Sequence, residues 1–123
     1  MNDREEIIKN YFQSWTSNNC KIIRGIFDPK VIYSECYGPE YRGIEVVERW
    51  FKDWNERGTV LAWDIKQFIH SANVTVVEWY FKCKYDGEIG EFDGVSLIEF
   101  NEDNHIISLK EFQSKIPHYY PYN

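Results

Sequence analysis

Apolar side chains recur at helical spacing in the first half of the chain. Over residues 3–17 they follow the three-to-four-residue repeat of an amphipathic helix: Ile7, Ile8, Tyr11, Phe12 and Trp15. A short second helix is expected over residues 22–27, ended by Asp28-Pro29, and a third over about 44–57, ended by Gly58. Between them, residues 31–36 form a short β-type run. This half therefore predicts three helices and one strand.

The second half changes to the alternation of strands. Four long strands are expected at about 59–70, 74–85, 92–101 and 105–116, and Asp86-Gly87 is the strongest hairpin signal between them. Helices followed by a meander of long strands predict an α+β fold. The three N-terminal helices would pack on one face of a strongly curved, mostly antiparallel sheet, within a single domain over residues 1–123.

Alternation also separates the two faces of the strands. Trp79, Phe81 and Cys83 share one side of their strand, and Trp63 shares a side with Ile69 in the strand before it. This apolar set is expected to face the helices. The opposite face is amphipathic rather than fully polar, which favours a homodimer formed through the outer face of the sheet.

Aromatic residues are in excess: the chain has five Trp, nine Tyr and eight Phe in 123 residues. So many large rings are expected to leave a concave space that accepts a flat, mostly apolar small molecule with one carbonyl or hydroxyl. Ordinary core packing is the alternative for most of them. The side chains expected to bind this ligand are Trp15, Tyr33, Trp50, Trp54, Trp63, Trp79, Phe81 and Cys83.

Charge and motifs exclude several classes of function. Lys and Arg number 14 against 20 Asp and Glu, a net charge of −6, which disfavours nucleic-acid binding. There is no apolar run near the ~20 residues of a membrane span and no signal-peptide pattern, so a cytoplasmic protein is expected. The three cysteines and three histidines lack metal-ligand spacing, and no phosphate-binding glycine loop occurs, so neither metal nor cofactor is expected.

Three segments carry a resemblance to a known family: residues 78–81 (Glu-Trp-Tyr-Phe), 92–100 (beginning Phe-Asp-Gly-Val-Ser) and 106–112 (ending Leu-Lys-Glu-Phe). With the order of elements, they resemble the SnoaL-like branch of the NTF2-like superfamily, to which ketosteroid isomerase also belongs. The resemblance implies a cone in which the sheet wraps around a deep pocket capped by the helices, and a dimer through the outer sheet face. It says little about activity, because this fold hosts many chemistries.

The resemblance also suggests site residues. Tyr11 falls where the isomerases have an oxyanion-hole tyrosine, Glu35 where they have the carboxylate base, and Ser96 where they have an oxyanion-hole aspartic acid. Glu111 resembles the last acid of the limonene-epoxide hydrolases. Trp79 and Phe81 occupy the places of that family's other catalytic residues, so epoxide hydrolysis is not expected.

Two functions follow as hypotheses. In the first, the protein is a cofactor-independent isomerase, cyclase or dehydratase: Glu35 is the base, Tyr11 polarises a carbonyl, Ser96 is a weak second donor and Glu111 shuttles a proton. In the second, it is a non-catalytic small-ligand-binding or dimerisation module. Each site residue has a plainer alternative: Glu35 at an edge facing water, Glu111 in an ion pair with an arginine, and Tyr11 as a core residue.

Two further positions are left open by the sequence. Cys36 follows Glu35, and strand alternation places it on the opposite face, away from any pocket. The tail over residues 116–123 holds two prolines and three tyrosines, so it either covers the pocket mouth, packs on a neighbouring subunit, or frays.

Overall fold

The computed structural model describes residues 3–122, and it confirms the α+β class with three helices ahead of the long strands. In chain order its elements are α1 (Asp3–Thr16), the short 3₁₀ helix η1 (Cys20–Ile22), α2 (Ile23–Ile26), β1 (Phe27–Ser34), β2 (Glu40–Arg42), α3 (Ile44–Arg57), β3 (Gly58–Ser71), β4 (Val74–Tyr85), β5 (Glu88–Phe100) and β6 (Ile106–Lys115). Within the described residues, no helix is long and apolar enough to cross a membrane.

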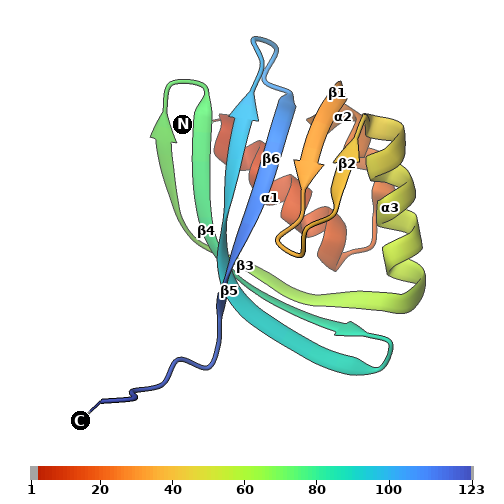
Figure 1. Cartoon of the computed structure of the whole chain (residues 1–123). Helices are drawn as coiled ribbons and strands as arrows, with labels where there is room; N and C mark the ends of the chain where they lie inside the picture. The colour runs from red at the N-terminus through yellow and green to blue at the C-terminus, as the bar shows by residue number, and fades with distance from the viewer. Residues whose placement is uncertain (1–2, 123) are drawn as a thin grey trace.

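The six strands form one sheet in the order β2-β1-β6-β5-β4-β3. Only β1 and β6 run parallel, and the other neighbours are antiparallel. The long strands bend in their middle, so that their lower halves curl towards α3 (Figure 1). Asp86 and Gly87 both have positive φ and close the β4–β5 hairpin, as their sequence predicts. The curl creates a concave face for the helices.

The edge of the sheet differs from the sequence prediction. β1 begins at Phe27, so Asp28-Pro29 lies inside a strand rather than after a helix. Its pairing with β6 is irregular between Phe27 and Ile32, and Pro29 lies in that stretch, where a missing N–H breaks no regular ladder. The three-residue strand β2, which the sequence did not predict, pairs with the end of β1.

Two bulges in β3 change which side chains face inwards. The pairing with β4 shifts between Val60 and Ala62 and again between Ile65 and Gln67. After the second shift, Phe68 packs against the core and Ile69 is 56% exposed. The prediction that Ile69 shares the face of Trp63 is therefore wrong, because a bulge reverses the alternation that the prediction assumed.

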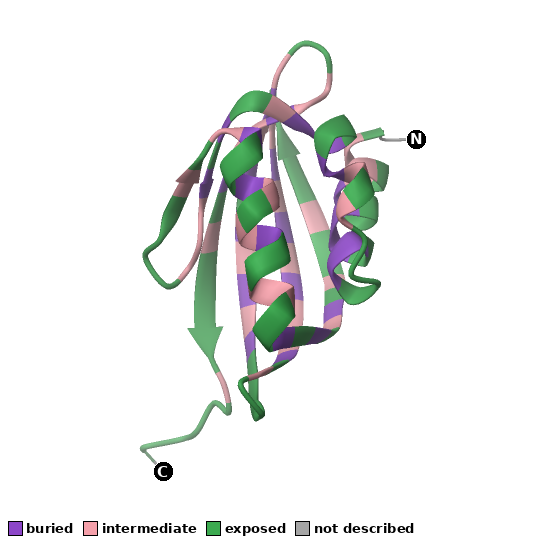
Figure 2. Cartoon of the chain, turned by 90° about the vertical axis from the view of Figure 1, so that its right-hand side faces the viewer, coloured by how far each residue is buried: buried purple, intermediate pink, exposed green. Residues whose placement is uncertain are grey.

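The helices cover the concave face of the sheet. In α3, buried residues form a stripe turned to the sheet and exposed residues cover the outside (Figure 2). Near the β5–β6 turn the core is closed by apolar side chains that are at most 1% exposed: Ile8, Ile23, Phe27, Phe100, Ile106 and Leu109. At the opposite end of the sheet, aromatic rings line the interior instead.

The chain end leaves the sheet. After β6 the tail extends away from the body of the molecule (Figure 1). Tyr119, Tyr120 and Tyr122 are almost fully exposed, and none of them lines the interior of the sheet. Within this chain, the described part of the tail does not cover the concave side.

Candidate functional site

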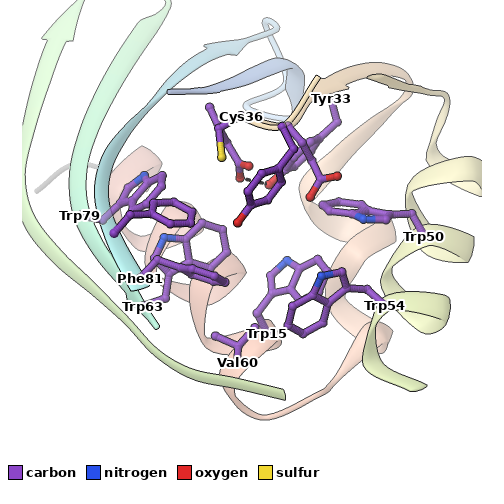
Figure 3. A pocket seen from close by; sticks show the side chains of 13 residues that line it. Trp15, Tyr33, Cys36, Trp50, Trp54, Val60, Trp63, Trp79 and Phe81 are labelled. Atoms are coloured by element: carbon purple, nitrogen blue, oxygen red, sulfur yellow. Dashed lines mark hydrogen bonds between the residues drawn. The ribbon is translucent and has the colours of Figure 1, made fainter. Parts of the chain in front are cut away.

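A pocket opens between the curled half of the sheet and helices α1 and α3. The space enclosed between the side chains is about 40 Å³, enough for a few water molecules, and it opens at the mouth to solvent. It is lined by Trp15, Tyr33, Glu35, Cys36, Tyr37, Trp50, Trp54, Val60, Trp63, Trp79, Phe81, Phe92 and Glu111. The rings of Trp50 and Trp54 approach from the α3 side, and those of Trp63, Trp79 and Phe81 from the sheet (Figure 3).

Local structure explains how these side chains converge. Trp50 and Trp54 lie one turn apart on α3 and therefore share a face. Trp79 and Phe81 alternate inwards on β4. The parallel pairing of β1 with β6 matches Tyr33 with Leu109, and Glu111 lies two residues beyond on the same face of β6. Thus a tyrosine and a carboxyl group that are far apart in the chain become neighbours.

Two tyrosines and one carboxyl group form a continuous hydrogen-bonded chain. The Tyr11 hydroxyl donates to the Tyr33 hydroxyl at 2.7 Å, and the Tyr33 hydroxyl donates to Glu111 Oε2 at 2.5 Å. Tyr11 and Tyr33 have no exposed surface. Burial, followed by the nearby charge of Glu111, raises the pKa of both phenols well above the usual value, so both stay protonated.

Glu111 carries the most perturbed carboxyl group of the pocket. Its pKa is raised to about 8, mainly by burial and also by the charge of Glu35, while hydrogen bonds from Tyr33 and the Cys36 backbone lower the pKa. No ion pair within residues 3–122 includes Glu111 or Glu35. Glu111 is therefore mainly protonated at neutral pH and can donate as well as accept a hydrogen bond.

Glu35 is the second carboxyl group of the pocket. It lies just beyond β1, and its Oε1 accepts a hydrogen bond from the Tyr41 hydroxyl at 2.7 Å. Burial raises its pKa, and the hydrogen bond from Tyr41 partly offsets that rise. Glu35 thus faces neither bulk water alone nor an arginine, the two plainer alternatives for an acidic residue at a strand end.

A groove continues from the pocket towards solvent. Glu35, Tyr37, Trp50 and Trp54 line both spaces. The groove is completed by Pro39, Tyr41, Asp53, Arg57, Cys83 and Tyr85. The Arg57 guanidinium bonds the Asp86 carboxylate, with Nε 3.0 Å from Oδ1. Glu35 therefore stands where the pocket meets its entrance.

The structure brings most of the predicted residues together. Of the twelve residues singled out from the sequence, nine line the pocket: Trp15, Tyr33, Glu35, Trp50, Trp54, Trp63, Trp79, Phe81 and Glu111. The other three lie behind or beside it. Tyr11 is behind Tyr33, Cys83 lines only the entrance groove, and the buried Ser96 hydroxyl accepts the Trp79 indole N–H at 2.9 Å.

Four lining residues were missed: Cys36, Tyr37, Val60 and Phe92. Cys36 reaches the pocket beside Glu35 because β1 ends at Ser34, so strand alternation no longer applies and the prediction of opposite faces is wrong. Burial raises the pKa of its thiol to about 12, which keeps it neutral. Phe92 could have been found, since it has the inward parity of Ser96 on β5.

The polar atoms of the site do not resemble a metal centre. Across residues 3–122, no three His, Cys, Asp or Glu side chains lie close enough together to hold an ion. The indole N–H of Trp63 is buried behind the pocket wall and has no hydrogen-bond partner in the structure.

The family follows from the chain itself. A model of the SnoaL-like domain matches residues 8–109, which include most of α1, all of α3 and most of the sheet. The chain belongs to the SnoaL-like domain family. A search among curated proteins found no match.

Solved structures agree with this assignment at the level of fold. A protein with a ketosteroid isomerase-like fold from Catenulispora acidiphila DSM 44928, in complex with trimethylamine, is 16% identical with a TM-score of 0.78 and covers 87% of this chain and 84% of its own. A candidate SnoaL-like polyketide cyclase from Shewanella putrefaciens CN-32 is 11% identical (TM-score 0.77, coverage 92% and 90%). An LEH-like epoxide hydrolase from M. tuberculosis is 8% identical (TM-score 0.79, coverage 89% and 80%). SnoaL-like and NTF2-like architecture is thus shared with proteins of different activities.

Proposed function

We propose that the pocket binds a small organic molecule and exchanges a proton with it, as a cofactor-independent isomerase, cyclase or dehydratase would. The observation that carries this proposal is the presence of two carboxyl groups with raised pKa, Glu35 and Glu111, in one aromatic pocket. Carboxyl groups whose pKa is raised by burial serve as general acids and bases.

The two carboxyl groups take different roles because their surroundings differ. Glu111 has a pKa of about 8 and is mainly protonated at neutral pH. It therefore acts as the acid that protonates a ligand oxygen or donates a hydrogen bond to it. Glu35, whose carboxylate is stabilised by the Tyr41 hydroxyl, loses its proton first and acts as the base. This assignment keeps the predicted role of Glu35 and makes Glu111 its partner.

The residues behind the wall position these groups. The Tyr11 hydroxyl donates to Tyr33 and does not line the pocket, so we assign Tyr11 to holding Tyr33 rather than to polarising a carbonyl. Ser96 bonds the Trp79 indole, and we assign it to orienting that ring rather than to donating to a ligand. The Catenulispora protein, which shares the fold, is in complex with a small organic molecule, trimethylamine, and this supports a binding function for the fold.

The experiment is deuterium exchange into a small ketone. Cyclohexanone is incubated with the protein in deuterated buffer at neutral pH, and loss of the protons next to its carbonyl is followed by NMR. We expect exchange above the buffer rate, and a decrease of about 100-fold or more in Glu35→Gln, since general-base catalysis contributes about 10²–10⁴-fold. Glu111→Gln should lower the rate as well.

Glu45→Gln is the matched control, because Glu45 is an exposed carboxylate on the first turn of α3. It should exchange the ketone at the wild-type rate. Exchange that is equally fast in wild type, Glu35→Gln and buffer alone would contradict the catalytic proposal.

A non-catalytic binding module is the second candidate. It is favoured by the engagement of the pocket's hydroxyl groups, since Tyr33 donates to Glu111 and Tyr41 donates to Glu35. In that case ligands would quench the fluorescence of the pocket tryptophans while no substrate exchanged its protons. Binding without exchange would thus select this function.

We also propose that a second copy of the chain covers the outer face of the sheet. Leu97 on β5 and Phe112 on β6 are 43% and 46% exposed, and they lie near each other because Val95 pairs with Phe112 and Leu97 with Lys110. Sedimentation should give a dimer for the wild type and a monomer for Leu97→Asp/Phe112→Asp. A monomeric wild type at micromolar concentration would contradict it. Location in the cytoplasm and the absence of a nucleic-acid partner stay predictions of the sequence.

A further inference from the structure

We infer that the ligand of this pocket is a cation, specifically a small molecule with an alkylated ammonium group. The inference rests on the proposed function, because it names the class of ligand for the same pocket. It departs from the neutral ligand that the aromatic composition alone suggests. Three features carry it: the rings, the sign of the charges that line the pocket, and the position of Glu35.

The first feature is the density of aromatic faces. Nine of the thirteen lining residues are aromatic: Trp15, Tyr33, Tyr37, Trp50, Trp54, Trp63, Trp79, Phe81 and Phe92. The face of an aromatic ring is electron-rich and attracts a cation, and tryptophan does so most strongly. Five of the nine are tryptophan, which is every tryptophan in the chain. An apolar ligand could be held equally well by aliphatic side chains, which are almost absent here.

The second feature is the arrangement of these rings around a common space. Trp50 lies with its centroid 4.9 Å from Tyr33 and 5.0 Å from Trp15, at tilts of 54° and 57°. Trp15 meets Trp54 edge to face at 5.5 Å. Rings that contact one another at these angles form a continuous aromatic wall along the pocket (Figure 3). Cages of aromatic rings recognise quaternary ammonium groups, whose methyl groups suit an apolar wall.

The third feature is charge of one sign. The lining includes the carboxylate of Glu35 and no Lys, Arg or His, while Glu111, mainly protonated at neutral pH, adds little charge. At the entrance, Asp53 adds a further acid, and the basic residue there, Arg57, is bonded to Asp86. An anionic ligand would meet no counter-ion inside. A cation would pass Glu35, which borders both groove and pocket, and enter a site with matching potential.

The test compares two molecules of the same shape and different charge. Choline and 3,3-dimethyl-1-butanol differ in a single atom, a charged nitrogen in place of a neutral carbon. Isothermal titration of the full chain should show choline binding about tenfold or more tightly than its neutral counterpart, as expected for a cation between desolvated aromatic faces. Equal affinities, or no choline binding at millimolar concentration, would overturn the inference.

Variants separate the contribution of charge from that of shape. Glu35→Gln keeps the size of the side chain and should reduce choline affinity about tenfold while leaving the affinity of 3,3-dimethyl-1-butanol unchanged. Trp54→Leu should lower the preference for choline over the neutral molecule, with circular dichroism used to verify the fold. Glu45→Gln, an exposed change outside the pocket, should leave both affinities at the wild-type value. A wild-type choline preference in Glu35→Gln would contradict the role assigned to that carboxylate.

The outcomes distinguish this inference from the proposed function. Ketone exchange without a preference for choline would overturn only the cationic ligand. A preference for choline without exchange in any ketone would leave the cationic ligand standing and contradict the catalytic proposal. A protein that binds neither probe and exchanges nothing would overturn both.

Discussion

The two ends of the concave face of the sheet are built from different side chains, although α1 runs across both. Near the β5–β6 turn, Ile8, Phe100 and Ile106 are at most 1% exposed, and none of them lines the pocket or its entrance groove. At the other end, the rings of Trp15, Trp63 and their neighbours surround a pocket that also holds two carboxyl groups. Both ends are apolar, so hydrophobicity alone does not distinguish a core from a site.

Shape and polarity make the difference. Branched aliphatic side chains adjust to fill the space between a helix and a sheet, whereas rigid indoles that meet edge to face leave gaps. The gaps persist here because polar groups border them: Glu111 would be buried at greater cost if the rings closed around it. The end of the sheet that is lined by aromatic rings and carboxyl groups therefore contains a pocket. The end that is lined by aliphatic side chains is filled by them.

The largest expected loss of stability comes from replacing one of two phenylalanines that face inwards on β5. Phe100→Ala in the closed end should lower the free energy of unfolding by about 3–5 kcal/mol, because it leaves a cavity in solid packing. Phe92→Ala should cost roughly 1–2 kcal/mol less, since the space it vacates joins an existing pocket. Urea denaturation measures both. Equal losses would show that the pocket end is packed as tightly as the closed end.

A second pair of variants tests how the pocket wall is held. A Cβ at Gly94 would lie 2.4 Å from the Phe112 carbonyl oxygen and 2.5 Å from Cη2 of Trp79, so Gly94→Ala must displace backbone or ring. We expect a loss of about 1–3 kcal/mol and altered tryptophan fluorescence.

The matched control on the same strand is Gly90→Ala. The nearest atom to its added Cβ is Cys83 Sγ at 3.8 Å, an ordinary contact, so stability should change by less than about 1 kcal/mol. If the Gly94 variant were as stable as this control, Trp79 would not be fixed against β5 as described.

A pH dependence of stability tests the pocket end separately. Around Glu111 stand Tyr33, Tyr11, Cys36 and Glu35, and its pKa is raised to about 8 from a usual value of 4.5. The folded state therefore binds this proton more tightly than the unfolded chain. Between these pH values the free energy of unfolding should fall as pH rises, by at most about 1.4 kcal/mol per pH unit. Glu111→Gln should reduce that slope, leaving the smaller contribution of Glu35, and an unchanged slope in the variant would contradict the assignment.

Much of the fold and of the pocket wall could be predicted from the sequence. Helical periodicity gave α1 and α3, the Asp86-Gly87 pair gave the hairpin, and strand parity placed Trp79 and Phe81 on the inner wall. These features depend on residues close together in the chain, so the spacing of apolar side chains and the turn residues predict them. The resemblance added Glu35 and Glu111 to the pocket.

What could not be predicted depends on contacts between distant segments. The hydrogen bond between Tyr33 and Glu111 spans 78 residues and requires the parallel pairing of β1 with β6. No turn motif in the sequence predicts that pairing. The bulges that turn Ile69 outwards and the turn that brings Cys36 inwards break the alternation on which strand parity relies. Tyr11 has the spacing of a core residue, and the sequence does not show that its hydroxyl is used by Tyr33.

The central claim is that Glu111 is a sequestered carboxyl group bonded to Tyr33 at the base of an aromatic pocket. The most direct measurement is a pH titration of the side-chain carboxyl carbons by NMR in protein with ¹³C-labelled glutamate. One glutamate carboxyl should titrate with a pKa of about 8, and its signal should be missing from Glu111→Gln. A Glu111 signal that titrates near pH 4.5, like an exposed glutamate, would contradict it.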